Sequence, residues 1–243
     1  MFRHSLNENV QFKTYIDWFT LSFMAGNINA GGYLACRQFV SHVTGFATLA
    51  GISFEKNLTT EALALLSVPL FFLIGVMISG FLYERSQSSS KKINYALTMG
   101  FTTLLIAIVV VGGSLGWFGP FGEPSEIKND FLLLACLCCA SGLQNGAISL
   151  ASNYSIRTTH LTGTTTDLGL GLIKSIRSKT NNRMNTLRLA TIVSFIFGSF
   201  TAAFIYSQFK YLGFLVPMII SLYYTVIEII NSKNSYKPAH EFH

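Results

Sequence analysis

Charged side chains are scarce in this chain of 243 residues. Only 12% of the residues are Asp, Glu, Lys or Arg, whereas a soluble domain is about 25% charged. Apolar residues make up 50% of the chain, and the mean hydropathy is +0.45. This balance excludes an ordinary soluble globular protein and indicates an integral membrane protein.

Other features are missing as well, and each absence narrows the function. The chain has no G-x-x-x-x-G-K-[ST] loop, so we do not expect direct ATP-driven pumping. We expect no cleavable signal peptide, because no small-residue cleavage site follows a short apolar core near the N-terminus. The basic loops 86–92 and 177–183 indicate topology or contact with anionic lipid, and they do not suggest nucleic acid.

Cysteine is also rare, and its positions do not indicate a metal site. The four cysteines lie in or at the ends of apolar stretches, with no histidine close by in the sequence. We expect them to pack as small apolar side chains. Neither a metal nor a cofactor is expected. The cysteines are Cys36, Cys136, Cys138 and Cys139.

Long apolar stretches are what the chain does contain. Crossing a membrane takes about 20 apolar residues in a helix. The strongest stretches of that length are residues 62–83, 95–117, 187–206 and 211–230. Two more, 15–35 and 131–151, have a polar, glycine-rich second half, and we predict that they are helices with interruptions. The sequence thus predicts six membrane spans.

A polar motif occurs twice. His42-Val-Thr44-Gly45-Phe-Ala-Thr48-Leu-Ala-Gly51 returns 118 residues later as His160-Leu-Thr162-Gly163-Thr-Thr-Thr166-Asp-Leu-Gly169. A shared H-x-T-G-x-x-T-x-x-G pattern at nearly half the length of the chain indicates an internal duplication. Upstream of each copy, Asn29 and Asn145 occupy equivalent positions.

Three spans in each half give the two halves opposite orientations, because the second copy starts on the other side of the membrane. We therefore predict an all-α, polytopic membrane protein of about six transmembrane helices in two inverted three-helix repeats with broken or re-entrant polar segments. The expected parts are an N-terminal tail (1–14), a first repeat (15–118), a linker (119–130), a second repeat (131–231) and a C-terminal tail (232–243).

Lysine and arginine positions support this topology. Cytoplasmic loops hold the excess of positive charge, and thirteen of the 17 basic residues fall on the side of the N-terminus if six spans are drawn. Both tails are then cytoplasmic, in a bacterial inner membrane. The two motif segments, 39–54 and 160–173, are apolar enough to be buried and too short to cross, so we expect them to enter the membrane partway.

Polar, glycine-rich interruptions at matching places in two halves are typical of the centre of a transporter or channel. In that interpretation Thr44 and Thr162 cap short helices, while Gly45 and Gly163 allow close approach to the backbone. A helix N-terminus directed inward favours an anionic group.

The other candidates are polar side chains at or near the two motifs. His42 and His160 form a pair that can hydrogen bond or change charge near neutral pH. Asp167 has no counterpart, because Leu49 stands in its place, and an ionisable group within a membrane segment is a functional candidate. The predicted solute-binding residues are Asn29, His42, Thr44, Gly45, Asn145, His160, Thr162, Gly163 and Asp167.

Each of these residues also has a purely structural interpretation. The histidines can order their own turns, and the two asparagines can hydrogen bond across helices. Asp167 can pair with Lys174 or cap a helix. Four segments, however, carry a resemblance to a known family: Gly26-Asn-Ile-Asn29-Ala-Gly-Gly-Tyr-Leu, Phe39-Val-Ser-His42-Val-Thr44-Gly45, Gly142-Leu-Gln144-Asn145-Gly-Ala and Arg157-Thr158-Thr-His160-Leu-Thr162-Gly163.

From about Thr14 to Ile230, the chain resembles the YoaK-like family of bacterial inner-membrane proteins, a domain of unknown function. The resemblance implies a polytopic bacterial membrane protein and no particular activity. Members of that family commonly have an aspartate where Asn29 stands and an asparagine where Phe46 stands. This chain therefore lacks, in its first copy, the carboxylate and the asparagine amide that the resemblance would place there.

We interpret the protein as a secondary transporter or channel for a small solute, and not as an enzyme. A membrane interaction or scaffold protein with an architectural repeat is the alternative. An intramembrane serine hydrolase comes third, because Gly112-Gly-Ser114-Leu-Gly116 matches G-x-S-x-G but lies at the end of an apolar helix instead of on a strand-to-helix turn. The expected partners are membrane lipids and an unknown small solute, without nucleic acid, and a homo-oligomer is left open.

Overall fold

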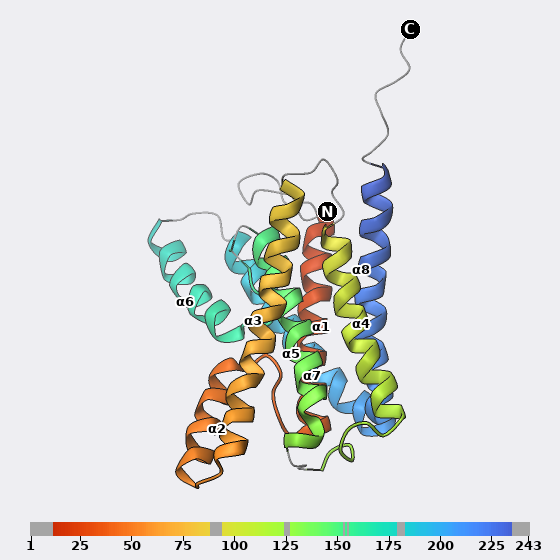
Figure 1. The fold of residues 1–243 in the computed structure, drawn as a ribbon. Coiled ribbons are helices and arrows are strands. Elements are labelled where there is room, and N and C mark those ends of the chain that lie inside the picture. Colours follow the sequence, from red (N-terminus) through yellow and green to blue (C-terminus); the bar gives the residue numbers. More distant parts are fainter. Residues whose placement is uncertain are drawn as a thin grey trace.

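The computed structural model describes residues 12–87, 94–123, 127–152, 154, 156–178 and 183–234. These residues form eight α-helices and one short 3-10 helix (Figure 1). The elements are α1 (Phe12–Cys36), α2 (Val43–Glu55), α3 (Thr59–Gln87), α4 (Asn94–Ser114), α5 (Ile127–Ala151), α6 (Leu161–Ser178), α7 (Arg183–Phe209), η1 (Lys210–Phe214) and α8 (Leu215–Asn234).

The helices follow one order twice: long, short, long, long. The six long helices lie side by side in a bundle, and the short helices α2 and α6 lie along one flank of it (Figure 1). The predicted motif segments, 39–54 and 160–173, correspond to α2 and α6 with their preceding loops. The start of α1 and the end of α8 lie at the same end of the bundle (Figure 1).

The two halves exchange partners. The first helix of each half packs against the third helix of the other, so that α1 lies against α7 and α5 lies against α3. A glycine allows each of these contacts. A Cβ atom on Gly26 would overlap the backbone of Phe195, and one on Gly142 would overlap the backbone of Phe72. Small residues of this kind let two membrane helices approach closely.

The partner helices carry glycines at the same crossings. A Cβ atom on Gly198 of α7 would overlap the backbone of Phe23, and one on Gly75 of α3 would overlap the backbone of Cys139. Hydroxyl groups add to the first crossing, where Ser199 Oγ donates to the Gly26 carbonyl oxygen at 3.1 Å. The crossings between the halves therefore rest on backbone contact.

The predicted interruptions in residues 15–35 and 131–151 are wrong. Both α1 and α5 are continuous helices through their glycine-rich second halves. The glycines there serve packing instead. Gly31 lies under the ring of Tyr206, and Gly146 lies against Val76 and Ser79 of α3. The glycine-rich composition suggested a break in each helix. Close contact between helices explains these glycines without a break.

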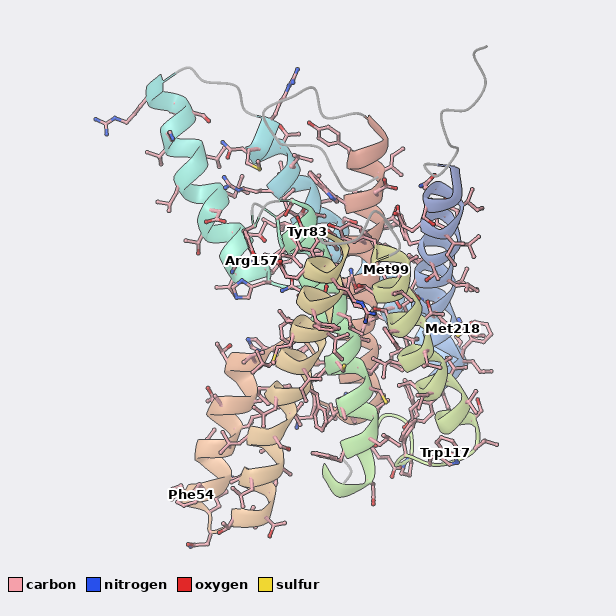
Figure 2. All side chains as sticks on the ribbon, turned by 45° about the horizontal axis from the view of Figure 1, so that its top comes forward. Phe54, Tyr83, Met99, Trp117, Arg157 and Met218 are labelled. Carbon is pink, nitrogen blue, oxygen red and sulfur yellow. The ribbon has the colours of Figure 1, made fainter. Side chains whose placement is uncertain are left out.

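Apolar side chains point outward over much of the surface. On α3, for example, exposed residues recur at helical spacing: Leu63, Leu66, Leu70, Met77 and Phe81. Figure 2 shows how side chains cover the outside of the helices. A soluble monomer rarely exposes apolar patches larger than a few hundred Å². This surface suits a lipid environment.

Four stretches of the described residues are long and apolar enough to cross a membrane. They are Thr59–Arg85, Tyr95–Ser114, Asn129–Ala151 and the 50-residue stretch Arg183–Ser232, which contains α7, η1 and α8. The expected span 15–35 forms α1 but is not among them. An all-α protein with membrane-like helices is thus confirmed, and the count of six crossings stays a prediction.

Candidate solute-binding cavity

The two copies of the motif meet at one cavity of about 650 Å³. The helices α2 and α6 both begin beside it and run toward opposite ends of the bundle (Figure 1). The second half of α5 and residues Phe72, Val76 and Gly80 of α3 form the remaining wall. The polar residues that line the cavity are Ser41, His42, Thr44, Asn145, Ser149, Tyr154, Arg157, Thr159, His160 and Thr162.

Each histidine folds back over the glycine of its own motif. His42 is the N-cap residue of α2, and a Cβ atom on Gly45 would lie only 2.8 Å from its Nδ1 atom. In the second copy, a Cβ atom on Gly163 would lie 2.5 Å from His160 Nδ1. The H-x-T-G spacing therefore has a steric reason, because glycine leaves room for the imidazole ring. Both histidines also line the cavity, so the structural interpretation does not exclude the functional one, which stays a prediction.

The first turns of α2 and α6 leave backbone donors free. The N–H groups of Val43, Thr44, Leu161 and Thr162 donate to no acceptor among the described residues. His42 makes no side-chain cap hydrogen bond. Such donors are ordinary at a helix start, but here two helix starts place them around the same cavity.

The expectation that Thr44 and Thr162 cap these helices is wrong. The helices begin one residue earlier, at Val43 and Leu161, so both threonines lie inside the first turn. Their carbonyl oxygens accept hydrogen bonds from Thr48 and Thr166, both at 3.0 Å. Histidine takes the place where a capping hydroxyl was predicted, and the threonine side chains line the cavity.

The two equivalent asparagines have different tasks. Asn29 Oδ1 accepts hydrogen bonds from the N–H and hydroxyl groups of Ser41, at 3.2 and 2.9 Å, and so holds the loop before α2. It does not line the cavity. Asn145 does line it, and its side-chain oxygen is buried without a partner among the described residues. Sequence equivalence therefore did not imply equal roles.

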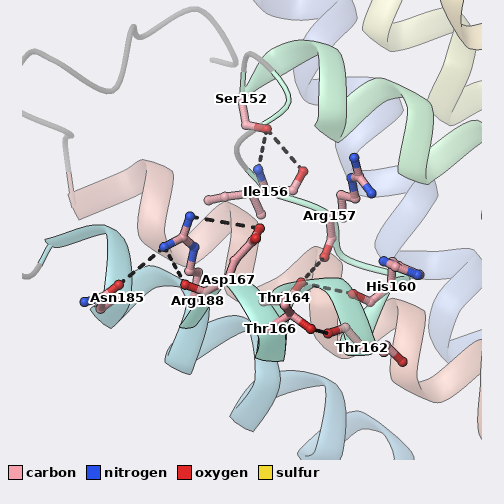
Figure 3. A network of polar contacts seen from close by, with 10 residues as sticks. All are labelled: Ser152, Ile156, Arg157, His160, Thr162, Thr164, Thr166, Asp167, Asn185 and Arg188. Atoms are coloured by element: carbon pink, nitrogen blue, oxygen red, sulfur yellow. Dashed lines mark hydrogen bonds and ion pairs between the residues drawn. The ribbon is translucent and has the colours of Figure 1, made fainter. Parts of the chain in front are cut away.

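Arg157 and Thr159 are cavity residues that were not among the predicted site residues. Arg157 lies three residues before His160, where the first copy has Phe39. Figure 3 shows the Arg157 and His160 side chains on the same side of this segment. The Arg157 guanidinium forms no ion pair with any described residue. The sequence offered one sign of this role: Arg157 is the only lysine or arginine among residues 152–160, just before the second motif.

Buried hydrogen bonds hold the segment that carries Arg157. Ser152 Oγ accepts from the Ile156 N–H at 3.0 Å and donates to the Ile156 carbonyl oxygen at 3.2 Å (Figure 3). The fully buried Gln144 donates to the Leu21 carbonyl oxygen at 2.6 Å and to Thr158 Oγ1 at 3.4 Å. These bonds anchor the described part of the loop between α5 and α6 to the bundle.

Asp167 lies outside this cavity. Its carboxylate is 4.0 Å from Arg188 Nη2, and Arg188 Nη1 donates to the Asp167 carbonyl oxygen at 3.0 Å (Figure 3). Both residues line a smaller neighbouring cavity of about 120 Å³. The structure pairs Asp167 with α7, and not with Lys174 as the structural alternative supposed.

A model of the family described as a protein of unknown function, DUF1275, matches residues 18–227. The chain belongs to this family. The resemblance to the YoaK-like family is thereby confirmed, because that family is the DUF1275 class. No curated protein and no solved structure matches the chain.

In this DUF1275 member, the segments that carry the family resemblance surround the cavity or support it. The serine of the G-x-S-x-G pattern does not. Ser114 Oγ donates to the Val110 carbonyl oxygen of its own helix at 2.8 Å. Nearby, Gly112 and Gly113 lie under the rings of Phe118 and Tyr211. These contacts explain the pattern by packing.

Proposed function

We propose that this DUF1275 protein is a secondary transporter or channel that carries a small solute through the cavity between α2 and α6. One observation carries the proposal: the two copies of a motif, 118 residues apart in sequence, line one cavity. A repeat that served architecture alone would not need to bring its polar residues together.

The arrangement of the helices supports an inverted repeat with six crossings. The helices α1 and α5 run in opposite directions, as do α2 and α6 (Figure 1). The glycine crossings support the same relation, because in each half the first helix packs against the third helix of the other half, α1 with α7 and α5 with α3. In this proposal α2 and α6 enter from opposite faces, both tails are cytoplasmic, and the membrane is the bacterial inner membrane.

Membrane physics supports a solute path at this place. Non-helical backbone at membrane depth is tolerated only where it is buried in protein or lines a water-filled cavity. The loops before α2 and α6 are such segments. Known transporter folds bind solutes where half-helices from two repeats meet. Because the chain has no ATP-binding loop, the proposed transport is passive or ion-coupled.

The test is uptake by proteoliposomes that contain the purified protein. A panel of small anions, cations, amino acids and metabolites is offered, and the initial rate is measured against concentration. We expect saturable uptake of at least one solute, with a loss of about tenfold or more when His42 and His160 are both replaced by alanine. Two imidazole rings line the cavity, and their removal takes away donors at both helix starts.

The matched control is the double variant Thr48→Ala and Thr166→Ala. These threonines occupy equivalent positions on the same two helices, are exposed, and do not line the cavity. The control should keep uptake within about twofold. If well-folded wild-type protein takes up nothing, the scaffold interpretation replaces the transport proposal. If the double histidine variant transports normally, the solute does not depend on this cavity and the proposed path is wrong.

A further inference from the structure

We propose that the cavity selects a small organic anion, a solute with a carboxylate or phosphate group on an uncharged body. This inference rests on the proposed function and specifies the solute class. It depends on three separate features of the cavity: its charge, its free donors and its apolar wall.

The charge of the cavity is positive. Arg157 contributes a guanidinium, a planar cation with several N–H donors. Among the described residues the lining contains no Asp or Glu. Asp167 lines the smaller cavity, which Arg157 also lines, and its carboxylate pairs there with Arg188. An arginine without a carboxylate partner in a concave site suits a bidentate contact with a carboxylate or phosphate.

The two helix starts add to this field. Each α-helix N-terminus carries the equivalent of about half a positive charge, and α2 and α6 have 13 and 18 residues. Their free N–H groups, on Val43, Thr44, Leu161 and Thr162, are donors for anion oxygens. His42 and His160 add a ring N–H each, whichever nitrogen carries the proton.

Thr159 is an independent sign that the cavity holds a ligand. Thr159 lines the cavity, it is only 5% exposed, and Thr159 Oγ1 has no hydrogen-bond partner among the described residues. A buried hydroxyl group without a partner costs about 1 to 3 kcal/mol. A bound anion would accept from this hydroxyl and from the helix starts together.

The remaining lining indicates that the solute is organic. Phe72, Val76 and Leu150 form an apolar wall, and a cavity of about 650 Å³ is much larger than a simple inorganic ion needs. The unpaired Asn145 oxygen is an acceptor, so it fits an uncharged donor on the same solute, such as a hydroxyl group. A solute with an anionic group for the arginine and the helix starts, and with an uncharged body for the apolar wall, would match this lining.

The charge of the cavity can be measured without knowing the solute. In a background with the four native cysteines replaced by alanine, Ser149→Cys places a thiol on the α5 wall of the cavity with little change in shape. Thr60→Cys, exposed at the start of α3, provides the reference outside it. Each thiol is treated with two methanethiosulfonate reagents of similar size, one carrying a sulfonate and the other a trimethylammonium group.

We expect the ratio of the two rates, anionic over cationic, to be about tenfold higher at position 149 than at position 60, since the fixed charge acts on the two reagents in opposite directions. Arg157→Gln should lower the ratio several-fold, and Arg157→Lys should keep it. Arg177→Gln, which removes a charge from α6 away from the cavity, is the matched control and should leave the ratio unchanged.

Equal ratios at the two positions, or a ratio that does not respond to Arg157→Gln, would overturn the inference. So would a thiol at position 149 that reacts with neither reagent, provided that Val43→Cys, at the start of α2 in the same lining, also fails to react. The labelling does not depend on uptake. Anion preference without transport would therefore refute the proposed function alone, and transport without anion preference would refute only the solute class.

Discussion

The two copies of the motif build the same turn with different charge. In both, histidine folds over glycine at the start of a short helix. Only the second copy adds Arg157 to the cavity and the Asp167–Arg188 pair behind it; the first has Phe39 and Leu49 at the equivalent positions. The shared residues therefore set the geometry, and the residues that differ set the electrostatics.

The supports of the two copies differ as well. The first copy is held by Asn29, which accepts from Ser41, and by Cys138, whose thiol donates to the Val40 carbonyl oxygen at 3.0 Å. Its short helix α2 packs against α3, the next helix in the chain. The second copy is held by Gln144, which donates to Thr158, and by Ser152, which accepts from the Ile156 N–H in the same loop. Its short helix α6 packs against α7. Both copies therefore pack their short helix against the following long helix, but the hydrogen bonds that hold the loop before the short helix differ.

The largest effect is expected where the copies agree most closely, at the glycine crossings. Gly26→Ala and Gly142→Ala should each cost more than about 3 kcal/mol of stability, since the new methyl group meets backbone that cannot move aside as a side chain can. The measurement is the yield of monodisperse protein in detergent and its melting temperature.

Gly51→Ala is the matched control for this pair, because a Cβ atom on Gly51 meets nothing within 4 Å. Alanine is favoured over glycine inside a helix by about 1 kcal/mol, so the control should be as stable as wild type or more so. A Gly142→Ala protein with wild-type stability would contradict the packing, as would unequal losses at the two equivalent crossings.

The next largest effect is expected where the copies differ in charge. Arg157→Phe gives the second copy the residue of the first, and it should lower the initial rate of anion uptake by about tenfold or more, because a charged hydrogen bond contributes about 1.5 to 3 kcal/mol. Stability should change little, since the side chain is exposed. The measurement is the rate at low solute concentration.

Arg37→Gln is the control, because Arg37 is a cation on the corresponding loop of the first copy that does not line the cavity and donates to the Gly122 carbonyl oxygen. Uptake should stay within about twofold. Equal losses in Arg37→Gln and Arg157→Phe would show that general charge at the surface matters, and the distinction between the copies would fail.

Much of this comparison was accessible from the sequence. The hydropathy pattern predicted the long helices closely, and the duplicated motif identified His42, Thr44, Asn145, His160 and Thr162, all of which line the cavity. These residues were found because duplication repeats local patterns, and because a membrane protein has few polar residues to choose from.

The rest depended on contacts between distant segments. Glycine-rich composition indicated broken helices, but only the partner helix shows that Gly26 and Gly142 are needed for close crossing. Arg157 stood in a segment of the family resemblance but was not predicted as a site residue, because the sequence does not show which cavity an arginine in a loop will line. Asn29 was expected in the site, and instead it anchors a site residue, Ser41.

A smaller effect is expected at the glycines beneath the histidines. Gly45→Ala and Gly163→Ala should leave stability unchanged or raised, because alanine favours the helix, yet each methyl group displaces an imidazole ring. Uptake should fall a few-fold. The loss should be larger for Gly163→Ala, where the methyl position lies 2.5 Å from the ring nitrogen, than for Gly45→Ala, where it lies 2.8 Å away.

Measuring uptake together with melting temperature separates this effect from unfolding. Gly169→Ala serves as the control on α6, because a Cβ atom there meets nothing within 4 Å. Reduced stability in Gly163→Ala, or uptake equal to that of Gly169→Ala, would mean that the ring position is unimportant for the solute.

The smallest effect is expected at Asp167, the acid that only the second copy has. Its side chain is 56% exposed and its carboxylate lies 4.0 Å from Arg188 Nη2, and an ion pair of this kind contributes about 0 to 1 kcal/mol. Asp167→Asn should therefore lower the melting temperature by at most a few degrees and keep uptake within about twofold. The backbone hydrogen bond from Arg188 to the Asp167 carbonyl oxygen survives the change, so α6 stays attached to α7.

A tenfold loss of uptake in a stable Asp167→Asn protein would contradict this expectation. It would mean that the smaller cavity belongs to the solute path. The charge difference between the two copies would then extend beyond Arg157.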